Sequence, residues 1–192
     1  MSVDHQRLER ARAMWRYVGE DRPPFADVPG PGQESVWDYP RPPRLAIDAR
    51  EVRVLAGGAS AGQAEPLEIA CSIRSLRVLE TASPPTFYLP AADVHTEWLV
   101  PAAGHSHCEW KGDAQYWSVH AGAIRLEAVA WSYPRPLPPY EALVDHFAFY
   151  PQQLVCLVDG VRARPQPGRF YAGWITQELA GPFKGEPDSS GW

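Results

Sequence analysis

The segment from His107 to Gly112, HCEWKG, places an imidazole, a thiol, a carboxylate and an amine close together. Alternate residues of a strand share a face. A strand here would turn Cys108 and Trp110 to one side, and Glu109 and Lys111, with the imidazole, to the other. A carboxylate and an amine can exchange protons, and a thiol can act as a nucleophile. The candidate catalytic residues are therefore Cys108, Glu109 and Lys111.

Simpler interpretations of the same residues stay open. Cys108 can be a buried structural cysteine, since a reactive thiol needs an electropositive, partly exposed setting. Glu109 and Lys111 can form an exposed ion pair that contributes less than about 1 kcal/mol. One feature favours a special role for the amine: Lys111 and Lys184 are the only lysines, and each lies between an aromatic residue and a glycine. A chain that otherwise uses Arg can keep Lys where a compact ammonium is needed.

Metal binding is the weaker hypothesis for this segment. His105 and His107 share a strand face, but Cys108 lies on the other face. A tetrahedral site takes four ligands, commonly from two such groups, and the sequence contains no second group and no CxxC pair. We therefore predict no metal and no other cofactor.

The chain is unusually rich in large aromatic residues, with 8 Trp and 8 Tyr. Most such rings pack in cores, but a small β domain cannot bury all of them, and some are expected to line a groove with a few polar groups. The rings concerned are Tyr88, Trp110, Tyr116, Trp117, Trp131, Tyr133, Phe149 and Tyr150. All of them except Trp117 form, with Lys111, the predicted ligand-binding set, and Glu109 would add a second polar group.

Short alternating runs predict that these residues are positioned by strands. The predicted strands are 52–56, 67–71, 76–79, 86–89, 107–111, 115–119, 124–133, 154–158 and 161–163, the last two joined by an Asp159-Gly160 hairpin turn. Helical spacing is confined to Asp4–Tyr17 and a short stretch at Pro139–His146. The sequence thus predicts a mainly β fold of antiparallel sheets with an N-terminal helix.

The stretch from Glu20 to Pro43 is rich in Pro and Gly, so no regular element is expected there. Its apolar residues predict an arm that lies on the domain surface. We divide the chain into residues 1–43, helix and arm, and residues 44–192, the β domain. Two alternatives remain open: a disordered tail, and a protein-interaction module that uses the Pro-rich arm.

Composition narrows the possible partners and compartments. A net charge of −5 with scattered Arg residues argues against nucleic-acid binding. Three cysteines without a pairing pattern favour a reducing compartment, so we expect a cytoplasmic protein. The first residues carry charges rather than an apolar leader, and no run approaches the ~18 apolar residues that span a bilayer. The sequence leaves the oligomeric state open.

Several motifs in fixed order resemble a bacterial family, domain of unknown function family 427. They run from about Glu34 to Trp192 and read ESVWDYPRPPR, LRVLETASPPTFYLPAADV, CEWKGDAQYW, AVAWSYPRP, FAFYP and QPGRFYAGWITQELAGPFKG. The segment between Gly58 and Leu76 is longer than the family pattern. The resemblance implies a β-tent fold, in which small twisted antiparallel sheets meet like a tent.

Relatives with that fold bind zinc through paired CxxC motifs, reduce methionine sulfoxide with a cysteine, or hold small ligands in aromatic cages. The family has also carried a nucleotidyltransferase-like label. The chain lacks the motifs that such chemistry needs, since it has no Gly-Ser motif followed by DxD and no P-loop. We therefore expect a small-ligand binding module with an aromatic cleft around CEWKG. The alternative is an enzyme that uses Lys111 and Glu109 as acid and base, or Cys108 as a thiol.

Overall fold

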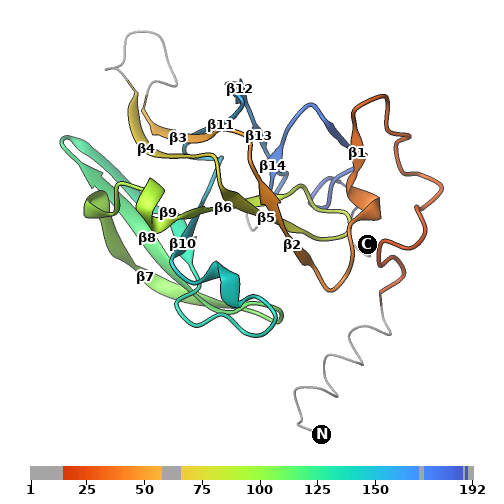
Figure 1. Ribbon diagram of the computed structural model, residues 1–192, viewed down its shortest axis with the longest axis horizontal. Coiled ribbons are helices and arrows are strands. Elements are labelled where there is room, and N and C mark those ends of the chain that lie inside the picture. Colours follow the sequence, from red (N-terminus) through yellow and green to blue (C-terminus); the bar gives the residue numbers. More distant parts are fainter. Residues whose placement is uncertain (1–14, 58–65, 169–170, 188, 190–192) are drawn as a thin grey trace, which may run out of the picture.

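The computed structural model describes residues 15–57, 66–168, 171–187 and 189, which form two antiparallel sheets and several short elements (Figure 1). The long sheet has seven strands, in the spatial order β2 (Arg44–Asp48), β5 (Ser75–Leu79), β6 (Thr86–Pro90), β10 (His146–Phe149), β9 (Ile124–Ser132), β8 (Gly112–Ala121) and β7 (Leu99–Cys108). The smaller sheet has four, in the order β12 (Val161–Arg162), β11 (Val155–Val158), β3 (Val52–Ala56) and β4 (Leu67–Ser72).

Short elements connect and flank the sheets. β1 (Glu34–Ser35) pairs in parallel with β15 (Leu179–Ala180), and β13 (Arg164–Pro165) pairs antiparallel with β14 (Trp174–Ile175). The described helical segments are single 3-10 turns: η1 (Val36–Asp38), η2 (Ala91–Asp93), η3 (Thr96–Trp98) and η4 (Glu141–Leu143).

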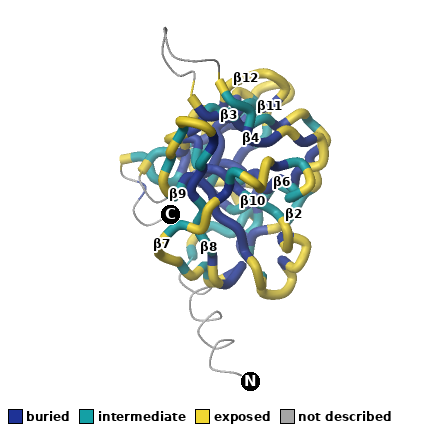
Figure 2. The backbone as a smooth tube through the Cα atoms, turned by 90° about the vertical axis from the view of Figure 1, so that its left-hand side faces the viewer, coloured by how far each residue is buried: buried dark blue, intermediate teal, exposed yellow. Residues whose placement is uncertain are grey.

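Alternation along β6 shows how the long sheet separates two layers. Phe87 and Leu89 belong to the main core, which also contains Val54 of β3 and Cys156 of β11, so this core lies between the two sheets. Tyr88 belongs to a second cluster, with rings from β9 and from the β7–β8 loop. Buried backbone accordingly runs through the middle of the molecule (Figure 2).

The predicted mainly β class with antiparallel sheets is confirmed. Strands occur at the predicted positions except at 107–111, where β7 ends at Cys108. The sequence missed β2, β10 and most of β7. The Asp159-Gly160 turn joins β11 to β12, with φ of 48° and 75° at its two residues, the left-handed backbone that a type I′ hairpin requires. The β-tent arrangement itself stays a prediction.

Two helix predictions fare differently. The stretch Pro139–His146 contains one short helix, the three-residue 3-10 helix η4, and β10 already begins at His146. Pairing of β10 between β6 and β9 overrides the weak local helical preference. The helix predicted over Asp4–Tyr17 lies outside the described residues except for 15–17, which are not helical.

The described part of the Pro-rich arm is packed and not wholly irregular, since it contains β1 and η1. Trp37 is fully buried, and its indole donates a hydrogen bond to the Pro182 carbonyl, 3.2 Å away. It belongs to a third cluster with Leu79, Ile175 and Phe183. The division of the chain into an arm and a domain stays a prediction.

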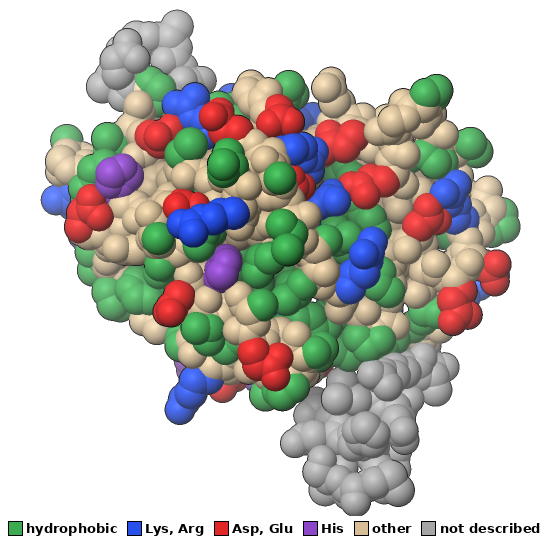
Figure 3. Space-filling view, viewed as in Figure 1, with side chains coloured by type: hydrophobic (Ala, Val, Ile, Leu, Met, Phe, Trp, Pro, Cys, Tyr) green, Lys and Arg blue, Asp and Glu red, His purple; other side chains and the backbone are tan. Residues whose placement is uncertain are grey.

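On the face shown in Figure 3, basic and acidic side chains lie interspersed and do not gather by sign. Several Arg side chains pair with Asp or Glu in the described structure, for example Arg53 with Glu68 and Arg74 with Asp93. No helix in the described part of the chain has the length and apolar character needed to cross a membrane.

Candidate functional site

The segment that the sequence predicts as a strand, 107–111, is instead a hairpin connection. β7 ends at Cys108, which is paired with Gly112 at the start of β8, so Glu109, Trp110 and Lys111 form the loop. Gly112 has φ of +91°, and a Cβ there would lie 3.2 Å from the Leu137 side chain. A left-handed backbone at this point favours glycine and turns the chain back.

This turn overturns the predicted separation of thiol and amine on opposite faces. The Lys111 amine donates a hydrogen bond to the Cys108 sulfur at 3.2 Å, and Lys111 is only 8% exposed. Glu109 is exposed whereas Lys111 is buried, so the interpretation of these two residues as an exposed ion pair was also wrong. Strand alternation does not apply within a three-residue loop, where the backbone changes direction.

Cys108 and Lys111 open into a cavity of about 470 Å³ on the face of the long sheet that lies opposite the main core. The cavity brings together seven of the eight predicted ligand-binding residues: Tyr88, Trp110, Lys111, Tyr116, Trp131, Tyr133 and Tyr150. The predicted catalytic candidates Cys108 and Glu109 also line it. Phe149 does not, because it points into the main core and is fully buried.

The rings of the cavity wall hold one another in place. Trp131 lies edge-on to Tyr88 with centroids 6.1 Å apart, and its indole donates to the Tyr88 hydroxyl at 3.2 Å. Tyr150 also packs against Trp131, with centroids 4.6 Å apart. The Tyr116 hydroxyl donates to Ser106 at 2.8 Å. A wall fixed in this way presents preformed apolar surface with a few polar tips.

Electrostatics keep Lys111 charged. Burial alone opposes its charge, but interactions with Tyr88, Cys108 and Glu80, including the hydrogen bond to the Cys108 sulfur, favour it more, so the pKa of Lys111 is raised. The amine lies 5.7 Å from the centroid of Tyr133, within range of a cation–π contact. Burial raises the pKa values of Tyr88 and Tyr133, so both remain neutral hydroxyl groups at physiological pH.

Sequence reasoning missed part of the lining, because it comes from distant segments. Glu80 follows β5, whereas Gln166, Tyr171 and Lys184 come from the C-terminal part of the chain. Only Lys184 carried a usable signal, since Phe183-Lys184-Gly185 echoes Trp110-Lys111-Gly112. No local pattern placed the other three at the cavity.

His107 and Cys108, which the sequence offered as possible metal ligands, contact different partners. His107 is exposed and lies 2.7 Å, Nδ1 to oxygen, from the Asp113 carboxylate. Cys108 is engaged by Lys111. Among the residues with described coordinates, no three His, Cys, Asp or Glu side chains come together in a way that would hold a metal ion.

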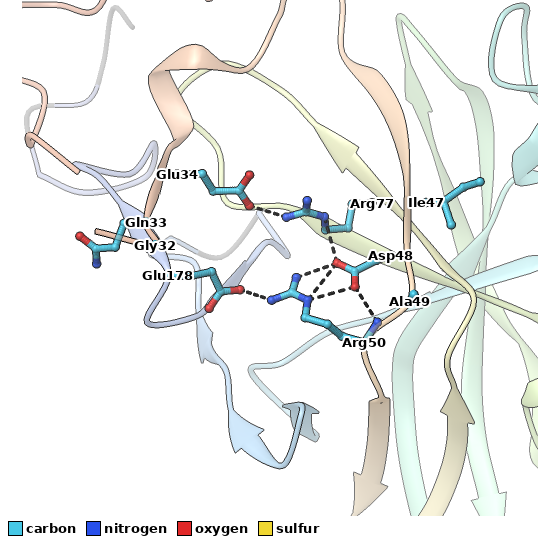
Figure 4. Close-up of a pocket in the computed structure, with 9 residues that line it drawn as sticks. All are labelled: Gly32, Gln33, Glu34, Ile47, Asp48, Ala49, Arg50, Arg77 and Glu178. Carbon is cyan, nitrogen blue, oxygen red and sulfur yellow. Dashed lines mark hydrogen bonds and ion pairs between the residues drawn. The ribbon is translucent and has the colours of Figure 1, made fainter. Parts of the chain in front are cut away.

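A second hollow, beside β2, is lined by charged side chains that satisfy one another (Figure 4). The Arg50 guanidinium binds the carboxylates of Asp48 and Glu178, and Arg77 binds Asp48 and Glu34. These contacts join the edge strand to β1 and to the segment before β15. With its charges mutually paired, this hollow is a structural junction rather than a ligand site.

The fold and the cavity define a class: a mainly β domain whose long sheet carries an aromatic cavity with a buried lysine. A family model described as domain of unknown function, DUF427, matches residues 44–162, more than half of the chain. The chain therefore belongs to the DUF427 family. A search of curated proteins finds no match.

Proposed function

We propose that the chain is a small-ligand binding module whose aromatic cavity holds a planar molecule, with Lys111 engaging an anionic or carbonyl group of that molecule. The observation that carries the proposal is a nearly buried, charged amine in a cavity walled by aromatic rings. The volume of about 470 Å³ lies within the range of small-molecule sites. Aromatic walls supply contact area, and the single ammonium supplies orientation.

Aromatic carboxylates such as benzoate and indole-3-acetate, alongside a wider metabolite library, test this function. We expect binding to shift the melting temperature and to quench tryptophan fluorescence, because Trp110 and Trp131 line the cavity. Lys111→Met should weaken carboxylate binding by about tenfold or more, since a hydrogen bond to a charged group contributes about 1.5–3 kcal/mol.

Trp98→Phe is the matched control, because Trp98 stacks on His95 and is not part of the cavity lining. It should leave the affinity unchanged. The proposal fails if no ligand class shifts the melting temperature or the fluorescence, or if Lys111→Met changes stability without changing affinity.

A second candidate function, an enzyme with a thiol nucleophile, is favoured by one contact. The Lys111 ammonium lies 3.2 Å from the Cys108 sulfur, and a neighbouring cation stabilises a thiolate. Glu109, on the same cavity, would then act as acid or base with Lys111.

Alkylation with iodoacetamide tests this candidate, because the described structure contains three free cysteines with different exposure. Cys71 is exposed, Cys108 is partly buried and Cys156 is buried. An activated Cys108 should label faster than the more accessible Cys71, as followed by peptide mass spectrometry. If Cys71 labels faster than Cys108, and Cys108 faster than Cys156, the rates follow exposure alone and the proposal of a thiol nucleophile is not supported.

The remaining expectations about context are also proposals. Cytoplasmic localisation is supported by the unpaired state of the three cysteines. A small molecule rather than nucleic acid is supported by the net charge of −5 and the interspersed surface charges. The arm of residues 1–43 is proposed to dock on the 44–192 domain, supported by the burial of Trp37.

A further inference from the structure

The only two lysines of the chain meet at one cavity. Each follows a buried aromatic residue, Trp110 at 6% exposure and Phe183 at 7%. Each precedes a glycine with left-handed backbone, φ +91° at Gly112 and +100° at Gly185. In both segments, therefore, the aromatic ring packs in a cluster, the glycine turns the backbone, and the lysine side chain lines the same cavity.

The two amines differ in their surroundings. The Lys111 amine is nearly buried and donates to Cys108. Within the described part of the chain, no hydrogen bond or ion pair engages the amine of Lys184, which lies 5.8 Å from the centroid of the Tyr171 ring. Burial and the charge of Arg41 lower the pKa of Lys184, against the opposing influence of Glu80 and Glu109.

The backbone of Lys184 is held in place at the cavity by its neighbours. The Lys184 backbone N–H donates to the Ala82 carbonyl at 2.7 Å, and its carbonyl accepts from the Gln166 side chain at 2.8 Å. Gly185 approaches Pro167 so closely that a Cβ would lie 2.1 Å from the Pro167 carbonyl oxygen. The Lys184 side chain thus extends into the cavity lining from a backbone that is held on both sides.

We propose that Lys184 is a carbonyl-reactive amine that forms an imine with an aldehyde or ketone held in the aromatic cavity, an inference that rests on the proposed binding function. A free amine is a nucleophile toward carbonyl carbon, and the Lys184 amine is half-buried beside the Tyr171 ring with no hydrogen bond in the described part of the chain. Lys111, which keeps its proton, is suited instead to bind an anionic group or the carbonyl oxygen of the same ligand.

The step balances without a further reactant. The lone pair of the Lys184 nitrogen attacks the carbonyl carbon; the oxygen takes up a proton and the nitrogen gives one up, which leaves a neutral carbinolamine. A second proton is then delivered to the hydroxyl, the C–O bond breaks with departure of water as the C=N bond forms, and the nitrogen releases its remaining proton to give the imine. Glu80 and Glu109 line the same cavity and can carry these protons.

Reductive trapping tests the proposal. The folded protein is treated with 4-carboxybenzaldehyde and sodium cyanoborohydride, and the benzylated amines are located by peptide mass spectrometry. We expect labelling of Lys184 to exceed that of Lys111 by about tenfold or more, because Lys111 is nearly buried and must give up its hydrogen bond to Cys108 before it can react. In urea the preference should disappear, since both amines then have ordinary surroundings.

Two variants complete the experiment. Lys184→Arg, checked for an unchanged melting temperature, should abolish the cavity adduct. Arg44→Lys supplies an exposed amine at the start of β2, outside the cavity, and should label more slowly than Lys184. Equal labelling of Lys184 and the amine introduced by R44K, or labelling of Lys111 in place of Lys184, overturns the imine proposal.

Benzoate, which lacks the aldehyde, separates this proposal from the binding function. If benzoate quenches the fluorescence but the aldehyde leaves no adduct on Lys184, the imine proposal is wrong and the binding function stands. If benzoate neither binds nor protects Lys184 from the aldehyde, the binding function fails as well. An adduct on Lys184 that benzoate suppresses supports both.

Discussion

Gly185, the residue after Lys184, lets two backbone segments approach closely beside the cavity. Its backbone has φ of +100°, and the space where a Cβ would lie is occupied by the Pro167 carbonyl, 2.1 Å from the oxygen and 2.9 Å from the carbon. A side chain there would be both strained and in collision. The glycine after each lysine therefore serves to turn the backbone, and Gly185 also permits the close approach that fixes Lys184.

We predict that Gly185→Ala lowers the free energy of unfolding by about 3 kcal/mol or more, from left-handed strain together with the collision. Gly32→Ala is the matched control, with φ of +77° and no atom within 4 Å of the new Cβ. It should cost only about 1 kcal/mol, the left-handed strain alone. Urea unfolding measures both variants, and equal losses would contradict the role of the Pro167 contact.

The edge strand β2 depends on charged side chains at its end. Asp48 accepts hydrogen bonds from Arg50 and forms an ion pair with Arg77, while Arg50 reaches on to Glu178 (Figure 4). Burial alone raises the pKa of Asp48, but hydrogen bonds from Arg50 and the charges of Arg50 and Arg77 outweigh burial, so this pKa is lowered. The network thus attaches the edge of the long sheet to the C-terminal segment.

A lowered folded-state pKa means that the stabilisation by Asp48 is present above the unfolded pKa and is lost as pH falls through the folded one. We predict that Asp48→Asn lowers the free energy of unfolding by about 2 kcal/mol near neutral pH. The difference from the parent protein should shrink below about pH 4. Urea titrations at both pH values measure the effect.

Asp38→Asn provides the matched control for this network. Asp38 pairs with Arg22 at the surface, where both side chains are more than 40% exposed, and solvent weakens such a pair. Its removal should change stability little at either pH. A loss as large as that of Asp48→Asn, or a loss at Asp48 that does not depend on pH, would contradict the assigned role of the network.

At the scale of the molecule, the second face of the long sheet needs a cover, and the chain supplies it from its C-terminal part. Tyr171, Ala172 and Lys184 line the cavity together with strand residues from the middle of the chain. These residues lie beyond position 162, where the DUF427 match ends. The cavity therefore depends on chain that the family match does not include.

Residue types and alternation in the sequence were sufficient for the fold class and for most of the aromatic rings that line the cavity. Period-two patterns identified β3, β4 and β9, and the excess of rings identified Tyr88 and Trp131 as wall residues. These features are local, since side chains alternate along any strand whatever its partner. The motifs of the DUF427 family could also be recognised in the sequence, because each motif is a run of consecutive residues.

Only the tertiary structure determined which of these residues lie next to one another. The loop at 109–111 replaced a strand and brought Lys111 to Cys108, because Gly112 pairs with Cys108 across the hairpin. β2 and β10 form because neighbouring strands satisfy their backbone groups, which no local propensity encodes. Lys184 joins Lys111 only because a segment more than seventy residues later folds over the sheet, a contact that depends on packing and leaves no periodic trace in the sequence.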